Sequence, residues 1–270
     1  MKETLDRERF EREAEKYAAY LETPEGRLRL DLPFANLQEV LPKPTSALHA
    51  LDIGGGTGSL TVRLARLGVH VTLLDASQSM LELAKHAAQQ AGVMERITLQ
   101  KGAAEQLPRF FAAGTFDLIL CHNVLEFVED PCAVLRSAAR VLRNNSGIIS
   151  VLVRNQTGEV LKAALLSGDL IAAERNLTAE WGDESLYGGR VRLFTPEILK
   201  RMMTASSLAV IEERGVRVIS DYLPTKVHRE DEYEQIYDLE SKLGGRREFA
   251  AVARYTHCLA RPLDSVIEDR

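Results

Sequence analysis

The chain has 270 residues, of which 45% are hydrophobic and 27% charged, and its formal net charge is −5. This length and composition indicate one sizeable α/β globular domain with insertions, and they exclude a disordered, repetitive or fibrous chain. The negative charge excludes a whole-protein field that attracts nucleic acid. The apolar runs are too short for a membrane span, and the charged start "MKETLDRERFERE" excludes a signal peptide, so we expect a cytoplasmic protein without a membrane partner.

The first 47 residues form a predicted N-terminal helical segment. Residues 1–21 have apolar side chains near helical spacing among acids and bases, which is typical of an amphipathic helix. A second helix is expected from about Arg27 to Val40, and "PKPTS" at 42–46 ends it.

Residues 48–154 alternate between short apolar runs and amphipathic stretches. The runs are "ALHALDI", "HVTLLD", "ITLQKG", "FDLILCH" and "GIISVLV". Strands separated by helices predict βαβ units and a parallel sheet covered on both faces. We therefore predict a Rossmann-like, doubly wound sheet of seven strands, mostly parallel with an antiparallel edge, whose cofactor-binding core is this segment.

The remaining chain completes that sheet. Residues 155–192 are helical and then polar, and they are predicted to be an inserted lid or acceptor segment. Residues 193–262 continue the sheet, with Thr195 as the N-cap of a helix, Pro196 at its first position, a strand over 209–219, a helix near 230–243 and a final strand over 249–261. Residues 263–270 are a tail.

The stretch "LDIGGGTGSL" after the first strand places four glycines in five positions. In a doubly wound sheet the ligand lies at this turn, where backbone N–H groups and a helix N-terminus converge. The dinucleotide pattern G-x-G-x-x-G requires glycine at position 59, which is Ser59, so a nicotinamide dehydrogenase is disfavoured. A structural tight turn is the alternative for the glycines.

The pattern D-x-G-x-G-x-G resembles motif I of class I S-adenosylmethionine-dependent methyltransferases, and three later segments resemble that family in the same order. They are "HVTLLD" ending at Asp75, "KGAAEQLP" and "FDLILCHNVLEFVEDP". The resemblance implies S-adenosylmethionine as cofactor and the following cofactor-binding residues: Arg29, Asp52, Gly54, Gly55, Gly56, Gly58, Asp75, Ala104, Glu105 and His122. Asp75 would accept hydrogen bonds from the ribose, or else act as a helix N-cap.

Two parts of the fourth segment have ordinary structural interpretations. His122 alone equally fits a hydrogen-bonded histidine at a strand end. Glu126 is predicted to belong to a solvated face, as is Glu129, and Asp130 to cap the following helix.

Segments outside this core are similar to the branch that includes bacterial tRNA methyltransferases acting on the carboxylate of 5-carboxymethoxyuridine at the wobble position. These segments are "TPEGRLRLDL", "RNQTG", "GVRVISDYL", "YEQIYDLESKL" and "RYTHCLARP". In that branch the arginine at the place of Arg29 holds the methionine carboxylate, which a guanidinium grips through two parallel hydrogen bonds. A surface arginine lying along its helix is the alternative.

The resemblance makes Asn155, Arg217 and Tyr222 candidates for acceptor binding, with Asp221 as a further one. Five basic residues are candidate phosphate contacts or else a solvated face: Arg190, Arg192, Lys226, His228 and Arg229. A carboxylate acceptor is ionised at neutral pH and needs no general base. A phenol or amine acceptor needs one, for which His122, Tyr222 and His257 are weak candidates.

Three functions therefore stay open. The first is methylation of the wobble carboxylate in tRNA, the second is O- or N-methylation of a small molecule under the 155–192 lid, and the third is a cofactor-binding module without turnover. Cys121, Cys132 and Cys258 form no CxxC pair, so we expect buried thiols and no metal site. The sequence does not indicate an oligomeric state.

Overall fold

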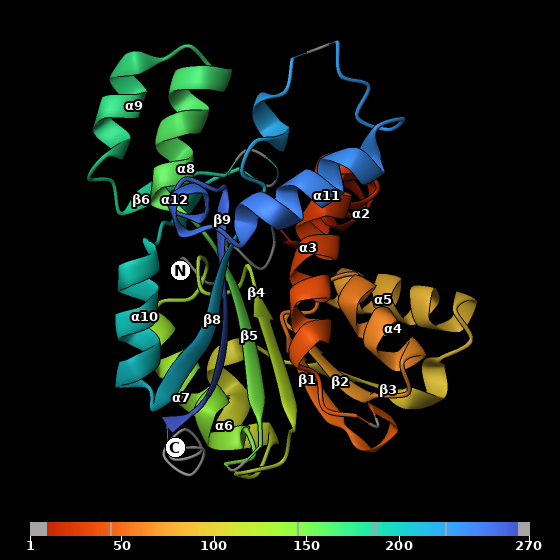
Figure 1. The fold of residues 1–270 in the computed structure, drawn as a ribbon. Helices are drawn as coiled ribbons and strands as arrows, with labels where there is room; N and C mark the ends of the chain where they lie inside the picture. The colour runs from red at the N-terminus through yellow and green to blue at the C-terminus, as the bar shows by residue number, and fades with distance from the viewer. Residues whose placement is uncertain are drawn as a thin grey trace.

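The structure, a computed structural model, describes residues 10–43, 45–144, 146–184, 186, 188–224 and 226–263. At its centre lies a seven-stranded sheet with the order β3-β2-β1-β4-β5-β9-β8 (Figure 1). The strands from β3 to β5 pair in parallel, whereas β9 is antiparallel to both of its neighbours. The strands are β1 (His49–Ile53), β2 (His70–Asp75), β3 (Ile97–Lys101), β4 (Leu118–His122), β5 (Ile148–Arg154), β8 (Leu208–Val216) and β9 (Tyr255–Pro262). The predicted Rossmann-like sheet with its antiparallel edge is confirmed.

Helices cover both faces of the sheet, because side chains alternate across each strand and both sets are apolar. Leu51 of β1 faces a core shared with α6 (Leu107–Phe110), α7 (Pro131–Val141) and α10 (Pro196–Ala205). Its neighbour Ala50 faces the opposite core. The helices on that side are α3 (Pro24–Val40), α4 (Ser59–Arg66) and α5 (Gln78–Gln90).

The N-terminal segment packs against the same end of the sheet as the glycine turn. The amphipathic helix expected over 1–21 is described from Phe10, and α2 covers Ala14–Leu21, while residues 1–9 lie outside the described residues. Helix α3 begins three residues before the expected Arg27, because Thr23 caps it by accepting a hydrogen bond from the backbone of Gly26 at 3.1 Å.

The segment after β5 forms a separate layer above the carboxyl ends of the strands. It contains α8 (Gln156–Leu161), a π-helical turn (Lys162–Leu166), α9 (Leu170–Asn176) and a hairpin of β6 (Trp181–Asp183) and β7 (Arg190–Arg192). In Figure 1 the α8–α9 pair projects away from the sheet. Among the described residues, every helix is too short or too polar to cross a bilayer.

The C-terminal part confirms one boundary and corrects another. Thr195 accepts a hydrogen bond from the backbone of Ile198 at 3.2 Å and caps α10, as predicted. The final strand begins at Tyr255 rather than near residue 249, since its pairings with the partner strands β5 and β8 both end at Tyr255. The chain before it forms α11 (Tyr233–Gly244) and the short α12 (Arg247–Ala250). Of the tail, residues 264–270 lie outside the described residues.

Candidate functional site

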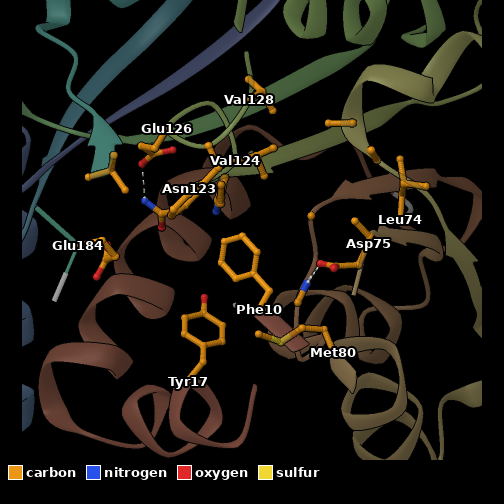
Figure 2. Close-up of a pocket in the computed structure, with 18 of the residues that line it drawn as sticks. Phe10, Tyr17, Leu74, Asp75, Met80, Asn123, Val124, Glu126, Val128 and Glu184 are labelled. Carbon is orange, nitrogen blue, oxygen red and sulfur yellow. Dashed lines mark hydrogen bonds between the residues drawn. The ribbon is translucent and has the colours of Figure 1, made fainter. Parts of the chain in front are cut away.

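A cavity of about 180 Å³ opens at the carboxyl ends of the parallel strands, where the glycine turn predicts a ligand. Its walls come from the turns after β1 to β4, from α2 and α3, and from the segment that includes the β6–β7 hairpin (Figure 2). Of the predicted cofactor-binding residues, those that line it are Arg29, Gly54, Gly56, Asp75, Ala104, Glu105 and His122. A smaller adjoining cavity is lined by Asp52 and Gly55 together with Arg29 and His122.

The glycine turn brings backbone close to the cavity in conformations that other residues rarely adopt. Gly54 and Gly58 have φ angles of 62° and 76°. A Cβ atom on Gly54 would lie 2.6 Å from a methyl carbon of Val124. A Cβ on Gly58 would lie 2.9 Å from that of Ala84 on α5. The turn therefore requires glycine for its backbone path and for the close packing of α5.

Two carboxylates flank this turn. Asp75, the last residue of β2, accepts hydrogen bonds from the backbone N–H groups of Gly56 and Ser77, each at 2.9 Å. It also faces the cavity (Figure 2), and burial raises its pKa. Asp52 is 3% exposed and accepts a hydrogen bond from Thr61 at 2.6 Å. Burial raises the pKa of Asp52 to about 7. Asp52 thus fixes the turn to α4, and Asp75 also presents a carboxylate to the ligand space.

Arg29 is buried at the cavity wall rather than lying on the surface. Its side chain comes from α3, is 8% exposed and donates a hydrogen bond to the hydroxyl of Tyr17 at 2.5 Å. Its guanidinium carbon lies 5.2 Å from the ring centroid of Tyr17 and 5.1 Å from that of Tyr20. These tyrosines hold a cation at the end of the cavity nearest the smaller chamber.

His122 ends a chain of buried hydrogen bonds that crosses the sheet. Ser150 Oγ lies 2.7 Å from His122 Nε2 and 2.8 Å from His257 Nε2. Asn36 Nδ2 lies 3.1 Å from His257 Nδ1, and Arg214 donates to Asn36 Oδ1 at 2.9 Å. The arginine turns the asparagine amide so that it donates to His257, which then donates to the serine hydroxyl, which donates to His122. His122 therefore carries its proton on Nδ1.

That Nδ1 atom is buried and has no hydrogen-bond partner among the described residues. Burial and the nearby Arg29 lower the pKa of His122 to about 3, and burial lowers that of His257 well below its usual value. Both rings are therefore neutral and weak as bases. Burial raises the pKa of Tyr222, the third candidate base, to about 12. The chain presents a fixed N–H donor at the site instead of a general base.

The three predicted acceptor residues lie outside the described lining of the cavity. Asn155 caps α8 and donates to two backbone carbonyls of the segment before β9, at 2.9 and 3.0 Å. Arg217 pairs with Asp221 and donates to Tyr20 at 2.7 Å. The hydroxyl of Tyr222 lies 3.4 Å from a carbonyl of α8. Their contact with an acceptor stays a prediction.

Several groups at the cavity were not predicted. They are Phe10, Tyr17, Glu126, Arg154, Glu184 and Tyr255. The expectation of a solvated Glu126 is wrong: the loop after β4 turns it inward, and it is 3% exposed. Arg154 did carry a sequence signal, since a charged residue ends a run of apolar strand residues just where parallel strands meet a ligand. Glu184 and Tyr255 carried none, because the fold brings them there from distant segments.

The N-cap role of Asp130 is confirmed, with a 2.9 Å hydrogen bond from the backbone of Ala133. Cys121 and Cys258 are buried as expected, while Cys132 is partly exposed. In the described part of the chain, no group of three or more histidine, cysteine, aspartate or glutamate side chains is placed to hold a metal ion.

Comparison with known proteins identifies relatives of this chain. Residues 51–150 match the family described as a methyltransferase domain. The tRNA 5-carboxymethoxyuridine methyltransferase of Escherichia coli (strain K12) is 30% identical over 260 residues, which cover 93% of this chain and 95% of that protein. The ubiquinone biosynthesis O-methyltransferase of Methylocella silvestris is 30% identical over 65% of this chain and 63% of its own length.

Among solved structures, a SAM-dependent methyltransferase from Thermotoga maritima superimposes with a TM-score of 0.62. It is 18% identical and covers 94% of this chain and 98% of its own. At that identity the likeness establishes a common fold.

Proposed function

Since this chain belongs to the S-adenosylmethionine-dependent methyltransferases, we propose that it methylates the carboxylate of 5-carboxymethoxyuridine at the wobble position of tRNA, in the cytoplasm. The observation that carries this proposal is the likeness to the Escherichia coli tRNA enzyme along 93% of this chain and 95% of the relative. That likeness extends well beyond residues 48–154, the predicted cofactor-binding core.

The residues at the site fit S-adenosylmethionine. His122, whose Nδ1–H has no partner among the described residues, and Arg29 line the same two cavities, and we assign their N–H groups to the methionine carboxylate. Asp75 is assigned to the ribose hydroxyls, and Ala104 and Glu105 to the edge of the adenine. The bare backbone of the glycine turn leaves room for the ligand between these groups.

When bound, the cofactor supplies an electrophilic methyl group on a sulfonium. The protein's task is then to hold the acceptor in line with that group, and such positioning can contribute roughly 7–11 kcal/mol. A carboxylate needs no base because it is ionised at neutral pH. This agrees with the two neutral, weakly basic histidines and with the high pKa of Tyr222.

The proposal is tested with tRNA from a strain that lacks methylation of the wobble carboxylate. Labelled S-adenosylmethionine and the purified protein should yield a methyl ester on the wobble uridine, identified by nucleoside mass analysis. The matched control is the same tRNA from a strain in which the ester is already present, which should accept little label. Turnover should fall steeply with added salt, since phosphate contacts release counterions. Absence of label from both tRNAs, with cofactor binding intact, would refute the proposal.

The alternative is an O- or N-methyltransferase for a small molecule, with residues 155–192 as its lid. It is favoured by the likeness to ubiquinone biosynthesis O-methyltransferases and by the aromatic rings of Phe10 and Phe127, whose centroids lie 5.0 Å apart. Both rings line the cavity. In that case methyl transfer to a phenol or amine would be found, and turnover would depend little on salt.

A further inference from the structure

Glu126 is held at the cavity wall by one of its two carboxyl oxygens. Oε1 accepts hydrogen bonds from Asn123 Nδ2 and from the backbone N–H of Arg154, both at 2.9 Å. The first of these is drawn in Figure 2. Oε2 is buried and has no hydrogen-bond partner in the described part of the chain. The side chain is 3% exposed and is part of the cavity wall.

An ionised carboxylate with one desolvated oxygen and no donor beside it is unfavourable, whereas a neutral acid avoids that cost. Burial accordingly raises the pKa of Glu126. Because the donors from Asn123 and the backbone of Arg154 both point at Oε1, the proton belongs on Oε2. The side chain of Arg154 does not supply the missing donor, since it pairs with Glu184 at 2.6 Å and Glu159 at 3.7 Å. Glu126 in its neutral form thus carries an O–H donor at the cavity wall.

A second hydroxyl faces the same space. Tyr255 pairs directly with Arg154 across β5 and β9, lines the cavity, and makes no hydrogen bond to another described residue. Burial alone would raise its pKa, but the surrounding guanidiniums, led by those of Arg29 and Arg217, lower it to about 8. At neutral pH the phenol is still mostly protonated and is a strong donor.

We propose that the space between Glu126 and Tyr255 is the subsite for the carboxylate of the acceptor, which binds one oxygen to the Oε2–H of neutral Glu126 and to the tyrosine hydroxyl. This inference rests on the proposed function and names the group recognised at that site. A ligand oxygen with full negative charge is the strongest partner for two O–H donors in a water-poor site.

The other oxygen of the acceptor remains without a donor and is the nucleophile. It forms the new O–C bond as the S–C bond of the methyl donor breaks, and the electron pair of that bond stays on sulfur. No proton leaves, because the acceptor is already ionised and Glu126 keeps its proton throughout. Glu126 therefore orients the acceptor and is not a base.

The decisive variant is Glu126→Gln, which keeps an oxygen for Asn123 and Arg154 and places an N–H donor where Oε2–H lies. We expect it to retain at least about a third of the wild-type kcat/KM for tRNA at neutral pH, with an unchanged Kd for S-adenosylmethionine. Glu126→Ala should lower kcat/KM for tRNA about 10-fold or more, through loss of a hydrogen bond to a charged group. The matched control is Glu129→Gln, an exposed glutamate three residues along the same loop, which should match the wild type.

A pH profile distinguishes this role from a purely structural one. The wild-type kcat/KM for tRNA should fall as pH rises through the pKa of Glu126, because the donor is lost, and this limb should be absent in Glu126→Gln. Tyr255 gives a separate limb near pH 8, which should persist in Glu126→Gln and disappear in Tyr255→Phe. The other charged or titratable groups lining the cavity are Tyr17, Arg29, Asp75, Glu105, His122, Arg154 and Glu184, and all of them are present in both variants.

Three results would overturn the inference. An inactive Glu126→Gln that folds and binds the cofactor would make Glu126 a general base for an acceptor that carries a proton. Identical pH profiles of kcat/KM for Glu126→Gln and the wild type would show that Glu126 has only a structural role. If neither Glu126 variant folds, Tyr255→Phe decides, since an unchanged KM for tRNA would exclude the subsite. A wild-type protein that esterifies no tRNA would instead refute the proposed function and this inference with it.

Discussion

Replacement of Arg29 tests the assignment of the methionine carboxylate. Arg29 is 8% exposed, lines both cavities and donates from Nη2 to the hydroxyl of Tyr17. Two charge-assisted hydrogen bonds, each worth about 1.5–3 kcal/mol, give a loss of about 3 kcal/mol in Arg29→Ala. Since 1.4 kcal/mol is a factor of ten, the Kd for S-adenosylmethionine should rise about 100-fold. Arg29→Lys keeps the charge but not the planar fork, so its Kd should lie between those of the wild type and Arg29→Ala.

Isothermal titration calorimetry with S-adenosylmethionine measures these constants, and thermal unfolding shows that the variants are folded. Arg27→Ala is the matched control, because it lies on the same helix, pairs with Glu230 at the surface and does not line the cavity. Its Kd should equal that of the wild type. An unchanged Kd in a folded Arg29→Ala would refute the assignment, and an equal loss in Arg27→Ala would show that the helix, not the guanidinium, is responsible.

Three further predictions concern stability. Gly58→Ala should lower the free energy of unfolding by more than about 1 kcal/mol, because the φ of this residue is 76° and the added Cβ would lie 2.9 Å from the Cβ of Ala84 on α5. Gly92→Ala should lower it less, because Gly92 has a φ of 68° but its added Cβ would have no described atom within 4 Å. Equal urea midpoints for the two variants would contradict this. Ser150→Ala removes the shared partner of the Nε2 atoms of His122 and His257, so it should cost about 2–4 kcal/mol and weaken cofactor binding. Ser206→Ala should cost less, because the buried hydroxyl of Ser206 has no hydrogen bond within the described residues. Burial raises the pKa of Asp52 to about 7, so the folded protein keeps a proton that the unfolded chain releases at pH ~4. The free energy of unfolding should therefore fall as pH rises between these two values. Urea unfolding of Asp52→Asn should show a flatter dependence of this free energy on pH, and an unchanged dependence would be evidence against the linkage.

Local sequence patterns predicted the ligand end of the sheet. Strand and helix periodicity depends on neighbouring residues, so the order of elements from β1 to β5 followed from the chain alone. The glycine turn and Asp75 were found because a parallel sheet directs its ligand to the ends of its strands. Arg29 was found through a resemblance, since nothing in its helix periodicity distinguishes it from an arginine on the surface.

The boundary of β9 and the orientation of Glu126 were decided by long-range packing. A strand ends where its partners end, and these partners lie more than 30 residues away along the chain. Glu126 looked solvated because a short loop of mixed residues has no periodicity that marks an inward side chain. Its burial depends on the backbone of Arg154, which β5 brings beside it.

The sequence alone predicted the order of the strands and the end of the sheet at which the cavity lies, because both follow from residues close together in the chain, and its resemblance to a family implied the cofactor class. Only the tertiary structure joined Asn36, Ser150 and His257 into the hydrogen-bonded chain that fixes the proton of His122. It also brought Glu126 to the cavity wall, where Asn123 and the backbone of Arg154 hold one of its carboxyl oxygens. A buried polar group is defined by its partners, and these come from strands and helices that meet only when the chain is folded.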